Sequence, residues 1–257
     1  MTQNNRTAIV TGGLSGMGRA IADRLVRDGN HVTIGSRRGD DEEAVRAVLG
    51  PLEELLNVAP LDVRSGESVE TFVAEVAERR GGVDILVNAA GVYEEAPVIG
   101  HSDDVWESQI DTNLSGTFRM IRAAMPHMKA GGWGRIVNLA SMAAHTGMEN
   151  NAAYCASKAG LLGLGRCVSL EGAAHGITCV AISPTWVETE MLLQFIEADI
   201  EATGKPREQV RTEYAASNPQ KQLVQPEEIA EIAAFLVSDA ARAITMTDYQ
   251  VNAGSPW

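Results

Sequence analysis

Tyr154 and Lys158 stand four residues apart, shortly after Ser141. The Ala and Leu content from Ala152 onward predicts a helix, so the phenol and the ammonium should lie one turn apart on the same face. A free phenol has a pKa of about 10, and a fixed cation within about 4–6 Å favours the phenolate. The pair is therefore a candidate for a proton-transferring tyrosine whose pKa is lowered by the lysine.

Ser141 ends an apolar run, residues 136–140, that predicts a buried strand. A hydroxyl at the carboxyl end of such a strand can hydrogen-bond a carbonyl in the crevice where open α/β sheets bind ligands. The alternative is a helix with an exposed Tyr and Lys, and a Ser in a turn. A Tyr-x-x-x-Lys pair taken alone is more often an exposed pair on a helix than a catalytic one. Whether this pair is catalytic therefore depends on the other motifs in the chain.

A glycine-rich turn follows the first apolar strand. Residues 7–11 predict the strand, residues 12–18 read GGLSGMG, and a helical pattern runs on to Gly29. In this context a glycine turn indicates a dinucleotide site, because the backbone can approach a pyrophosphate at the helix N-terminus. The spacing G-x-x-x-G-x-G departs from the commoner G-x-G-x-x-G, and tight strand-to-helix packing alone is the alternative. The expected cofactor contacts here are Gly12, Ser15, Gly16, Met17 and Gly18.

The end of the second strand indicates which dinucleotide binds. An acidic residue there would bond the ribose hydroxyls and repel a 2′-phosphate, but this chain has Ser36, Arg37 and Arg38. NADP(H) is therefore the expected cofactor, with NAD(H) as the alternative. The two arginines could instead pair with the acidic run at residues 40–43.

Three further positions point to the same crevice. Asp62 follows the third strand, where its carboxylate accepts from an adenine amino group or caps the next helix. The fourth strand leads into Asn88, Ala89, Ala90 and Gly91, whose small side chains leave room for a nucleotide, while the asparagine can tie neighbouring strands together. Asn113 lies inside a long helical pattern, where asparagine is unfavourable, so we expect it to make a specific interaction.

The alternation of strands and helices predicts a single α/β domain over residues 1–257 with a parallel, doubly wound sheet. Residues 188–224 predict an insertion of two helices, 188–202 and 206–216, broken at Gly204. Its position after a strand's carboxyl end makes it a candidate substrate lid, and a surface hairpin packed on the core is the alternative. Strands are expected at 7–11, 31–36, 57–60, 83–87, 136–140, 177–182 and 249–252, and other helices at 19–29, 41–49, 65–80, 105–128, from 152, and at 226–238.

Composition narrows the classes of partner. The 257 residues carry a formal net charge of -13, which argues against nucleic acid or an anionic membrane as a partner. Cys155, Cys167 and Cys179 form no C-x-x-C and predict reduced thiols, and no metal site is expected. The chain starts without a basic and then apolar leader and has no apolar run of about 18 residues, so we expect a soluble cytoplasmic protein.

Over essentially its whole length the chain resembles the short-chain dehydrogenase/reductase family. TGGLSGMG is similar to the cofactor turn of that family and NAAG to its sheet-stabilising motif. Asn113, Ser141, Tyr154 and Lys158 match its catalytic four in order and spacing. The resemblance implies a seven-stranded Rossmann-like subunit, usually in a homotetramer.

The resemblance also implies roles for individual residues. Tyr154 would be the acid/base and Ser141 would hold the substrate oxygen. Lys158 would bind the nicotinamide ribose and lower the phenol pKa, while Asn113 would order a water that reaches the lysine. The expected cofactor contacts of the family extend to the following residues: Asp62 and Val63 beside adenine, then Tyr154, Lys158, Pro184, Val187 and Thr189.

The later part of the chain is similar to bacterial 3-hydroxybutyrate dehydrogenases, but most polar residues with which those enzymes hold the substrate carboxylate are replaced. Tyr93, Ala143 and Asn151 stand at the aligned positions, and Gln194 remains of the set. A carboxylate desolvated without a cation or enough donors costs several kcal/mol. We therefore expect a neutral ketone or secondary alcohol, in a pocket bordered by Tyr93, Met142, Ala143, His145, Asn151, Trp186, Met191, Gln194 and Phe195.

Two departures from the family pattern bear on the site. The usual Pro-Gly after the sixth strand is Pro184-Thr185 here, and the glycine usual before the last strand is replaced near Met246. The sequence thus predicts an NADP(H)-dependent oxidoreductase of CH–OH and carbonyl groups. An NAD-dependent hydroxy-acid or polyol dehydrogenase is the alternative, and a nucleotide-sensing protein without turnover is the alternative from another class.

Overall fold

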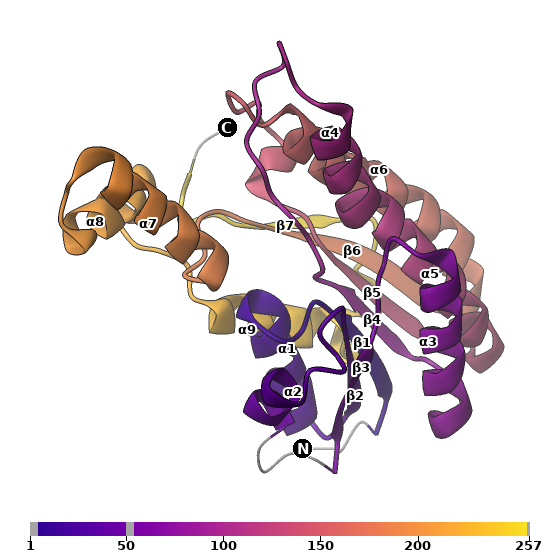
Figure 1. Cartoon of the computed structure of the whole chain (residues 1–257). Helices are drawn as coiled ribbons and strands as arrows, with labels where there is room; N and C mark the ends of the chain where they lie inside the picture. The colour runs from indigo at the N-terminus through magenta and orange to yellow at the C-terminus, as the bar shows by residue number, and fades with distance from the viewer. Residues whose placement is uncertain (1–4, 50–53, 256–257) are drawn as a thin grey trace.

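The protein is described by a computed structural model that covers residues 5–49 and 54–255. Its centre is one seven-stranded parallel sheet in the order β3-β2-β1-β4-β5-β6-β7 (Figure 1). The order reverses between β1 and β4, which is where such sheets open a crevice at the carboxyl ends of their strands. All seven predicted strands are confirmed with ends shifted by at most two residues: β1 Thr7–Thr11, β2 His31–Ser36, β3 Leu56–Pro60, β4 Ile85–Asn88, β5 Gly134–Leu139, β6 Ile177–Pro184 and β7 Asp248–Val251.

Helices cover both faces of this sheet, as the doubly wound prediction requires (Figure 1). Alternate residues of β1 enter different cores: Ala8 and Val10 pack with α1 and α9, whereas Ile9 packs with α3 and α5. Burial on both faces explains why the central strands are apolar runs without alternation. The helices are α1 Gly16–Arg27, α2 Glu42–Leu49, α3 Gly66–Arg80, α4 Asp103–Ile110, α5 Gly116–Gly131, α6 Ala152–Gly172, α7 Glu190–Thr203, α8 Arg207–Ser217 and α9 Pro226–Leu236.

The glycine turn between β1 and α1 packs directly against the segment that follows β4. Gly12 has φ +68°, and a Cβ there would lie 2.8 Å from the Ala90 Cα. A Cβ on Gly18 would lie 2.6 Å from the Gly12 carbonyl oxygen. Both glycines are therefore needed for backbone packing, and this packing also sets the shape of the turn.

Two polar side chains fix the carboxyl ends of the central strands. Asn88 donates from Nδ2 to Oδ1 of Asn138 across β4 and β5 at 2.9 Å, so the predicted tie between neighbouring strands is confirmed. Thr11 Oγ1 accepts from the backbone N–H groups of Ala89 and Ala90 at 3.1 and 3.0 Å. The segment leading to Gly91 is thus held over the end of β1.

The single helix predicted over 105–128 is wrong in detail. Residues Asp111–Ser115 form a π-helical segment between α4 and α5, and Asn113 lies within it. The Asn113 Oδ1 accepts from Val92 N at 2.8 Å while Nδ2 donates to Val92 O at 2.9 Å. The apolar pattern continues through this π-helical segment, in which the helix is locally wider than an α-helix. The sequence pattern therefore predicts one continuous helix.

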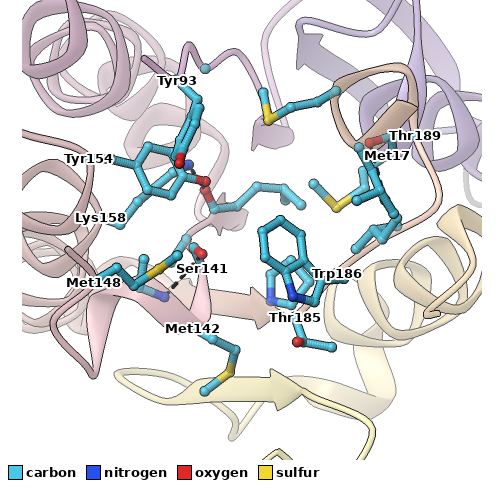
Figure 2. Close-up of a pocket in the computed structure, with 18 of the residues that line it drawn as sticks. Met17, Tyr93, Ser141, Met142, Met148, Tyr154, Lys158, Thr185, Trp186 and Thr189 are labelled. Atoms are coloured by element: carbon cyan, nitrogen blue, oxygen red, sulfur yellow. Dashed lines mark hydrogen bonds between the residues drawn. The ribbon is translucent and has the colours of Figure 1, made fainter. Parts of the chain in front are cut away.

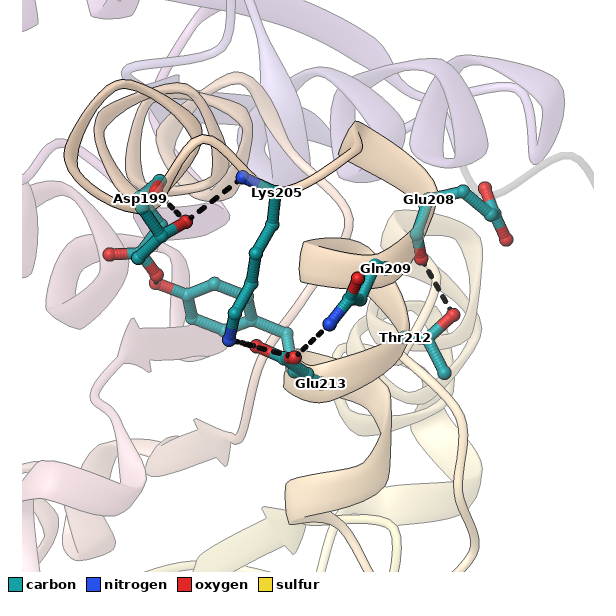
Figure 3. Close-up of polar contacts among 8 residues, drawn as sticks. Asp199, Lys205, Glu208, Gln209, Thr212 and Glu213 are labelled. Carbon is teal, nitrogen blue, oxygen red and sulfur yellow. Dashed lines mark hydrogen bonds and ion pairs between the residues drawn. The ribbon is translucent and has the colours of Figure 1, made fainter.

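The insertion after β6 forms a helical hairpin, α7 and α8, which projects from the sheet in Figure 1. Its break at Gly204 is confirmed by a left-handed backbone there, with φ +69°. Lys205 Nζ donates to both carboxylate oxygens of Glu213 at 2.8 and 2.9 Å, and Gln209 also donates to Glu213 (Figure 3). The hairpin has an apolar core of its own around Leu192, Ile196 and Val210.

The two ends of the insertion are joined by a short parallel bridge. Glu188 N donates to Val224 O at 2.9 Å, and Val224 N donates to Trp186 O at 3.0 Å. The hairpin therefore leaves and rejoins the domain at this bridge, and Gln220 N also donates to Ala253 O at 3.1 Å, after β7. Among the helices of residues 5–49 and 54–255, none is long and apolar enough to cross a membrane.

Candidate active site

Ser141, Tyr154 and Lys158 meet at the carboxyl end of β5. Tyr154 and Lys158 lie on α6, and the Lys158 Nζ is 5.6 Å from the centroid of the Tyr154 ring. The same Nζ donates to the Leu139 carbonyl oxygen at 2.7 Å, which fastens α6 to the last residue of β5. Ser141 follows that strand and hydrogen-bonds the Tyr154 phenol. The exposed-surface alternative is wrong, because Lys158 is 6% exposed.

Burial controls the proton affinities of this pair. Desolvation raises the pKa of Tyr154 above its ordinary value, and the hydrogen bond from Ser141 opposes this rise. Burial also lowers the pKa of Lys158 to about 8. The contributions to the Tyr154 pKa come from burial, Ser141 and Cys155, so the lowering of the phenol pKa by Lys158 stays a prediction. The ammonium is directed to the Leu139 carbonyl oxygen, and burial is the largest influence on the phenol pKa.

Asn113 makes the specific interaction expected of it. Its side chain is 1% exposed and bonds both backbone groups of Val92, and Nδ2 also donates to Ser157 Oγ at 3.1 Å. A Cβ on Gly91 would lie 3.3 Å from the Asn113 Oδ1 and 3.8 Å from the Lys158 Nζ. Asn113 is thus a neighbour of Lys158, and its role in ordering a water stays a prediction.

A cavity of about 320 Å³ opens beside the Tyr154 phenol (Figure 2). Six of the nine predicted pocket residues line it: Tyr93, Met142, Ala143, Trp186, Met191 and Phe195. The Tyr93 ring meets Tyr154 and Phe195 edge to face, at centroid distances of 5.0 and 4.8 Å. The phenol of Tyr93 donates to Glu95 at 2.6 Å. Burial and this carboxylate raise the pKa of Tyr93, which keeps it neutral.

Three predicted pocket residues do not line the cavity. His145 Nε2 pairs with Asp248 Oδ2 at 2.7 Å, which turns the imidazole towards β7. Gln194 is on the exposed side of α7, because the neighbouring Phe195 and Ile196 take the buried face. Asn151 is buried behind the wall, where it donates to Glu149 O and bonds the Tyr93 hydroxyl.

Sequence reasoning missed several residues that do line the cavity: Thr146, Met148, Leu192, Ser217, Asn218 and Ser255. Asn218 follows α8 and Ser255 follows β7. A signal was present for Ser255, since β6 and β7 are parallel neighbours and the segments after them meet at one edge of the sheet.

A second cavity of about 500 Å³ runs over the glycine turn. It shares Met17, Ala89, Gly91, Thr189 and Met191 with the first, so the two form one cleft. Of the predicted cofactor contacts, it is lined by Gly12, Ser15, Gly16, Met17, Gly18, Ser36, Arg37, Arg38, Asp62, Val63, Ala89, Ala90, Gly91 and Thr189, while Pro184, Val187, Tyr154 and Lys158 line the first cavity. Asn88 lines neither, because its side chain is used within the sheet.

The charged end of this cleft contains Arg37, Arg38 and Asp62. Among the described residues no ion pair joins either arginine to the acidic run at 40–43, and both are exposed. Asp62 accepts from the Arg64 guanidinium at 3.1 and 2.9 Å, and Arg64 holds the pKa of that carboxyl below its usual range. The alternative that Asp62 caps α3 is wrong, since Ser65 caps that helix.

Both departures from the family pattern have visible consequences. Thr185 places a hydroxyl in the cavity wall and donates it to Asn218 Oδ1 at 3.0 Å. Met246 adopts φ +60°, the left-handed conformation that glycine adopts at no steric cost. The Met246 N–H donates to Cys179 O at 2.9 Å, which fixes this turn before β7.

Comparison with known proteins settles the family. The family profile described as enoyl-(acyl carrier protein) reductase matches residues 12–255. The chain is 37% identical to a putative ketoacyl reductase from Streptomyces coelicolor, with 98% of each protein covered. The chain belongs to the short-chain dehydrogenase/reductase family. It is also 33% identical to a D-beta-hydroxybutyrate dehydrogenase from Cupriavidus necator, again over 98% of each. An actinorhodin polyketide ketoreductase variant, crystallised with NADPH, superposes with a TM-score of 0.91 at 37% identity and covers 98% of both chains.

As a short-chain dehydrogenase/reductase, the protein is an oxidoreductase that acts on hydroxyl or keto groups, and its family uses NAD(P). The predicted enzyme class and Rossmann-like fold are thereby confirmed. The alternative of a binding protein without turnover is set aside by the same relatives. Within the described residues no cluster of three or more His, Cys, Asp or Glu side chains could hold a metal ion.

The pKa of Lys158 predicts how ketone reduction depends on pH. The ammonium is present below about pH 8 and is lost as the pH rises through that value. We expect kcat/KM for ketone reduction with a bound nicotinamide dinucleotide to fall above about pH 8, by up to about tenfold per pH unit. The Lys158→Met variant should lack this inflection. An unchanged profile in the variant, with circular dichroism showing intact folding at each pH, would contradict the assignment.

Proposed function

We propose that the protein interconverts a neutral ketone and a secondary alcohol with NADP(H), using Asn113, Ser141, Tyr154 and Lys158. One observation carries the proposal. The Tyr154 phenol, with Ser141 and Lys158 beside it, forms part of the wall of an apolar cavity that is continuous with the cleft over the glycine turn. A proton donor thus lies between a place for a carbonyl compound and a place for a dinucleotide.

The cleft suits a dinucleotide. Ser15, Gly16 and Met17 line the cleft at the N-terminus of α1, whose first-turn N–H groups favour a pyrophosphate. In our proposal the adenine lies near Asp62 and Val63, and the nicotinamide end lies near Lys158 and Thr189. When bound, the dinucleotide supplies or accepts the hydride at the carbon that bears the substrate oxygen.

The protein residues handle the proton. Because burial raises the pKa of Tyr154, the phenol stays protonated at neutral pH and is ready to donate to the oxygen of a ketone that is being reduced. Ser141 positions that oxygen and the phenol through its hydroxyl. Lys158, charged below about pH 8, stabilises the negative charge that develops on the oxygen and then on the phenol. Asn113 fixes the segment over Lys158 through its bonds to Val92.

The cavity supports a neutral substrate. Among its described lining residues Lys158 has the only charged side chain, and its Nζ is bonded to Leu139 O. A carboxylate would enter without a free cation, at a cost of several kcal/mol. The hydroxy-acid alternative is therefore disfavoured, although a relative is named for D-beta-hydroxybutyrate.

The preference for NADP(H) is proposed from the charged end of the cleft. Arg37 and Arg38 line it next to Ser36, with no acidic side chain at the end of β2. Guanidinium groups bind phosphates with charge-assisted hydrogen bonds. The relative with NADPH in its crystal structure is consistent with this assignment, and NAD(H) is the alternative.

The α7 and α8 hairpin is proposed to act as a substrate lid over residues 188–224. Met191, Leu192 and Phe195 of α7 line the cavity, and the ends of the insertion are joined by the bridge between Val187 and Val224. A hairpin with its own core can move as a unit, and in our proposal its contacts with the domain at Asn218 and Gln220 are the ones that open. A homotetramer and a cytoplasmic location stay predictions.

Replacing the phenol hydroxyl tests the proton donor. Tyr154→Phe should leave NADPH binding largely intact and reduce ketone turnover by about 10²-fold or more, because general-acid help is lost. Stopped or slowed NADPH oxidation is read by absorbance over a panel of neutral ketones, with 3-oxobutyrate included as the charged comparison. Tyr249→Phe, on β7, is the matched control. Turnover like that of the wild type in Tyr154→Phe would refute the mechanism.

Reversing the charge at the end of β2 tests the cofactor preference. Arg37→Asp should raise the KM for NADPH by about tenfold or more and change the KM for NADH much less, because only NADPH has a 2′-phosphate. Arg79→Asp makes the same charge change on α3, away from the cleft. Equal losses for both cofactors in Arg37→Asp would overturn the 2′-phosphate role.

A further inference from the structure

Thr185, Asn218 and Ser255 form a hydrogen-bonded polar cluster in the wall of the largely apolar cavity. They come from three separate segments: Thr185 follows β6, Asn218 ends α8, and Ser255 follows β7. Figure 2 shows Thr185 with Trp186 across the cavity from Tyr93. The cluster therefore lies in the substrate cavity without belonging to the catalytic four.

The hydrogen bonds of this cluster fix the direction of every donor. Asn218 Nδ2 donates to the Gln222 carbonyl oxygen at 2.8 Å. That oxygen can only accept, so the amide of Asn218 must present its NH₂ group there and its Oδ1 to the opposite side. Asn218 is 1% exposed, which holds the amide in this orientation.

The same orientation determines what the two hydroxyls do. Thr185 Oγ1 lies 3.0 Å from Asn218 Oδ1, and Ser255 Oγ lies 2.9 Å from it. A carboxamide oxygen only accepts, so each of the two hydroxyls donates its single proton to it. What remains on the cavity side is the lone pairs of two hydroxyl oxygens, which are acceptors.

Resting on the proposed function, we propose that this cluster is a substrate subsite that binds a hydrogen-bond donor remote from the carbonyl. The substrate class is then a neutral ketone or secondary alcohol that carries a second hydroxyl or N–H group, with an apolar middle. Ethers, esters and carboxylates cannot use the subsite, because they offer acceptors to acceptors. Thr185, Ser255 and the buried Asn218 behind them are the specificity-determining residues.

The apolar middle follows from what lies between the two polar ends. Met142, Trp186 and Phe195 line the cavity that contains both Tyr154 and the cluster. Aromatic rings and a thioether pack well against flat or bulky apolar groups, and they form few hydrogen bonds. A substrate that reaches from Tyr154 to the cluster therefore passes mainly apolar side chains between these two polar ends.

A matched series of ketones tests the subsite. The probes are 4-(4-hydroxyphenyl)cyclohexanone, its methyl ether and 4-phenylcyclohexanone, with 4-hydroxycyclohexanone and cyclohexanone as a shorter pair. In the longer pair, the shorter pair or both, we expect the ketone with the hydroxyl to have a kcat/KM about 5–10-fold above that of the matching ketone without it. This factor corresponds to one neutral hydrogen bond. The methyl ether should gain nothing, because it keeps the oxygen and loses the donor.

Variants locate the effect. Thr185→Val and Ser255→Ala should each reduce the ratio between donor-bearing and donor-free ketones, and the double variant should bring it to about one. Ser238→Ala is the control, since Ser238 lies outside the cavity lining and donates its hydroxyl to Phe235 O. Circular dichroism and NADPH binding verify that each variant is folded. A ratio that survives in the double variant, or equal rates for phenol and ether in the wild type, would overturn the subsite.

The outcome separates the subsite from the proposed function. If no probe is reduced, the proposed function fails, and direct titration of the same ligands into the protein still tests the cluster. Tighter binding of the phenol than of its methyl ether, lost in the double variant, would support the subsite. Equal binding of the two would contradict it.

Discussion

The hydrogen bond from Lys158 Nζ to the Leu139 carbonyl oxygen is the contact on which the site depends. It joins α6 to the carboxyl end of β5, and it places a buried ammonium where Ser141, Tyr154 and Gly91 converge. A buried charge is retained only where it is bonded and where function requires it. The parallel sheet provides that place, because the free carbonyls and the loops of β4, β5 and β6 all meet at one edge.

Burial also determines whether Tyr154 is set to donate or to accept a proton, because it raises the pKa of the phenol. The phenol stays protonated at neutral pH because burial raises its pKa, while burial also lowers the pKa of Lys158 to about 8. Such a pair is suited to proton donation to a carbonyl oxygen at neutral pH. The largely apolar cavity around it, with hydroxyl oxygens at the Thr185 side, is the basis of our proposal that the substrate is uncharged.

The sequence predicted the sheet and most of the cleft, because these depend on local signals. Apolar runs buried on both faces mark strands such as residues 7–11 and 177–182, and the glycine turn is fixed by close backbone contacts at Gly12 and Gly18. The remainder depends on contacts between distant segments. His145 is hydrogen-bonded to Asp248 and so does not line the cavity, and Asn88 is hydrogen-bonded to Asn138 within the sheet. Asn218 and Ser255 line the cavity although they lie far along the chain from Tyr154. The pKa of Tyr154 followed from burial, which no spacing of residues reports.

Titration of the Tyr154 phenol in the protein without cofactor tests the central claim most directly. The chain has four tyrosines, so ¹³Cζ tyrosine labelling gives a small spectrum in which the resonance missing from Tyr154→Phe is that of Tyr154. The account predicts a Tyr154 pKa above the ordinary value of a tyrosine, because burial dominates. A pKa below that ordinary value, rising again in Lys158→Met, would contradict it and would show that the lysine controls the phenol.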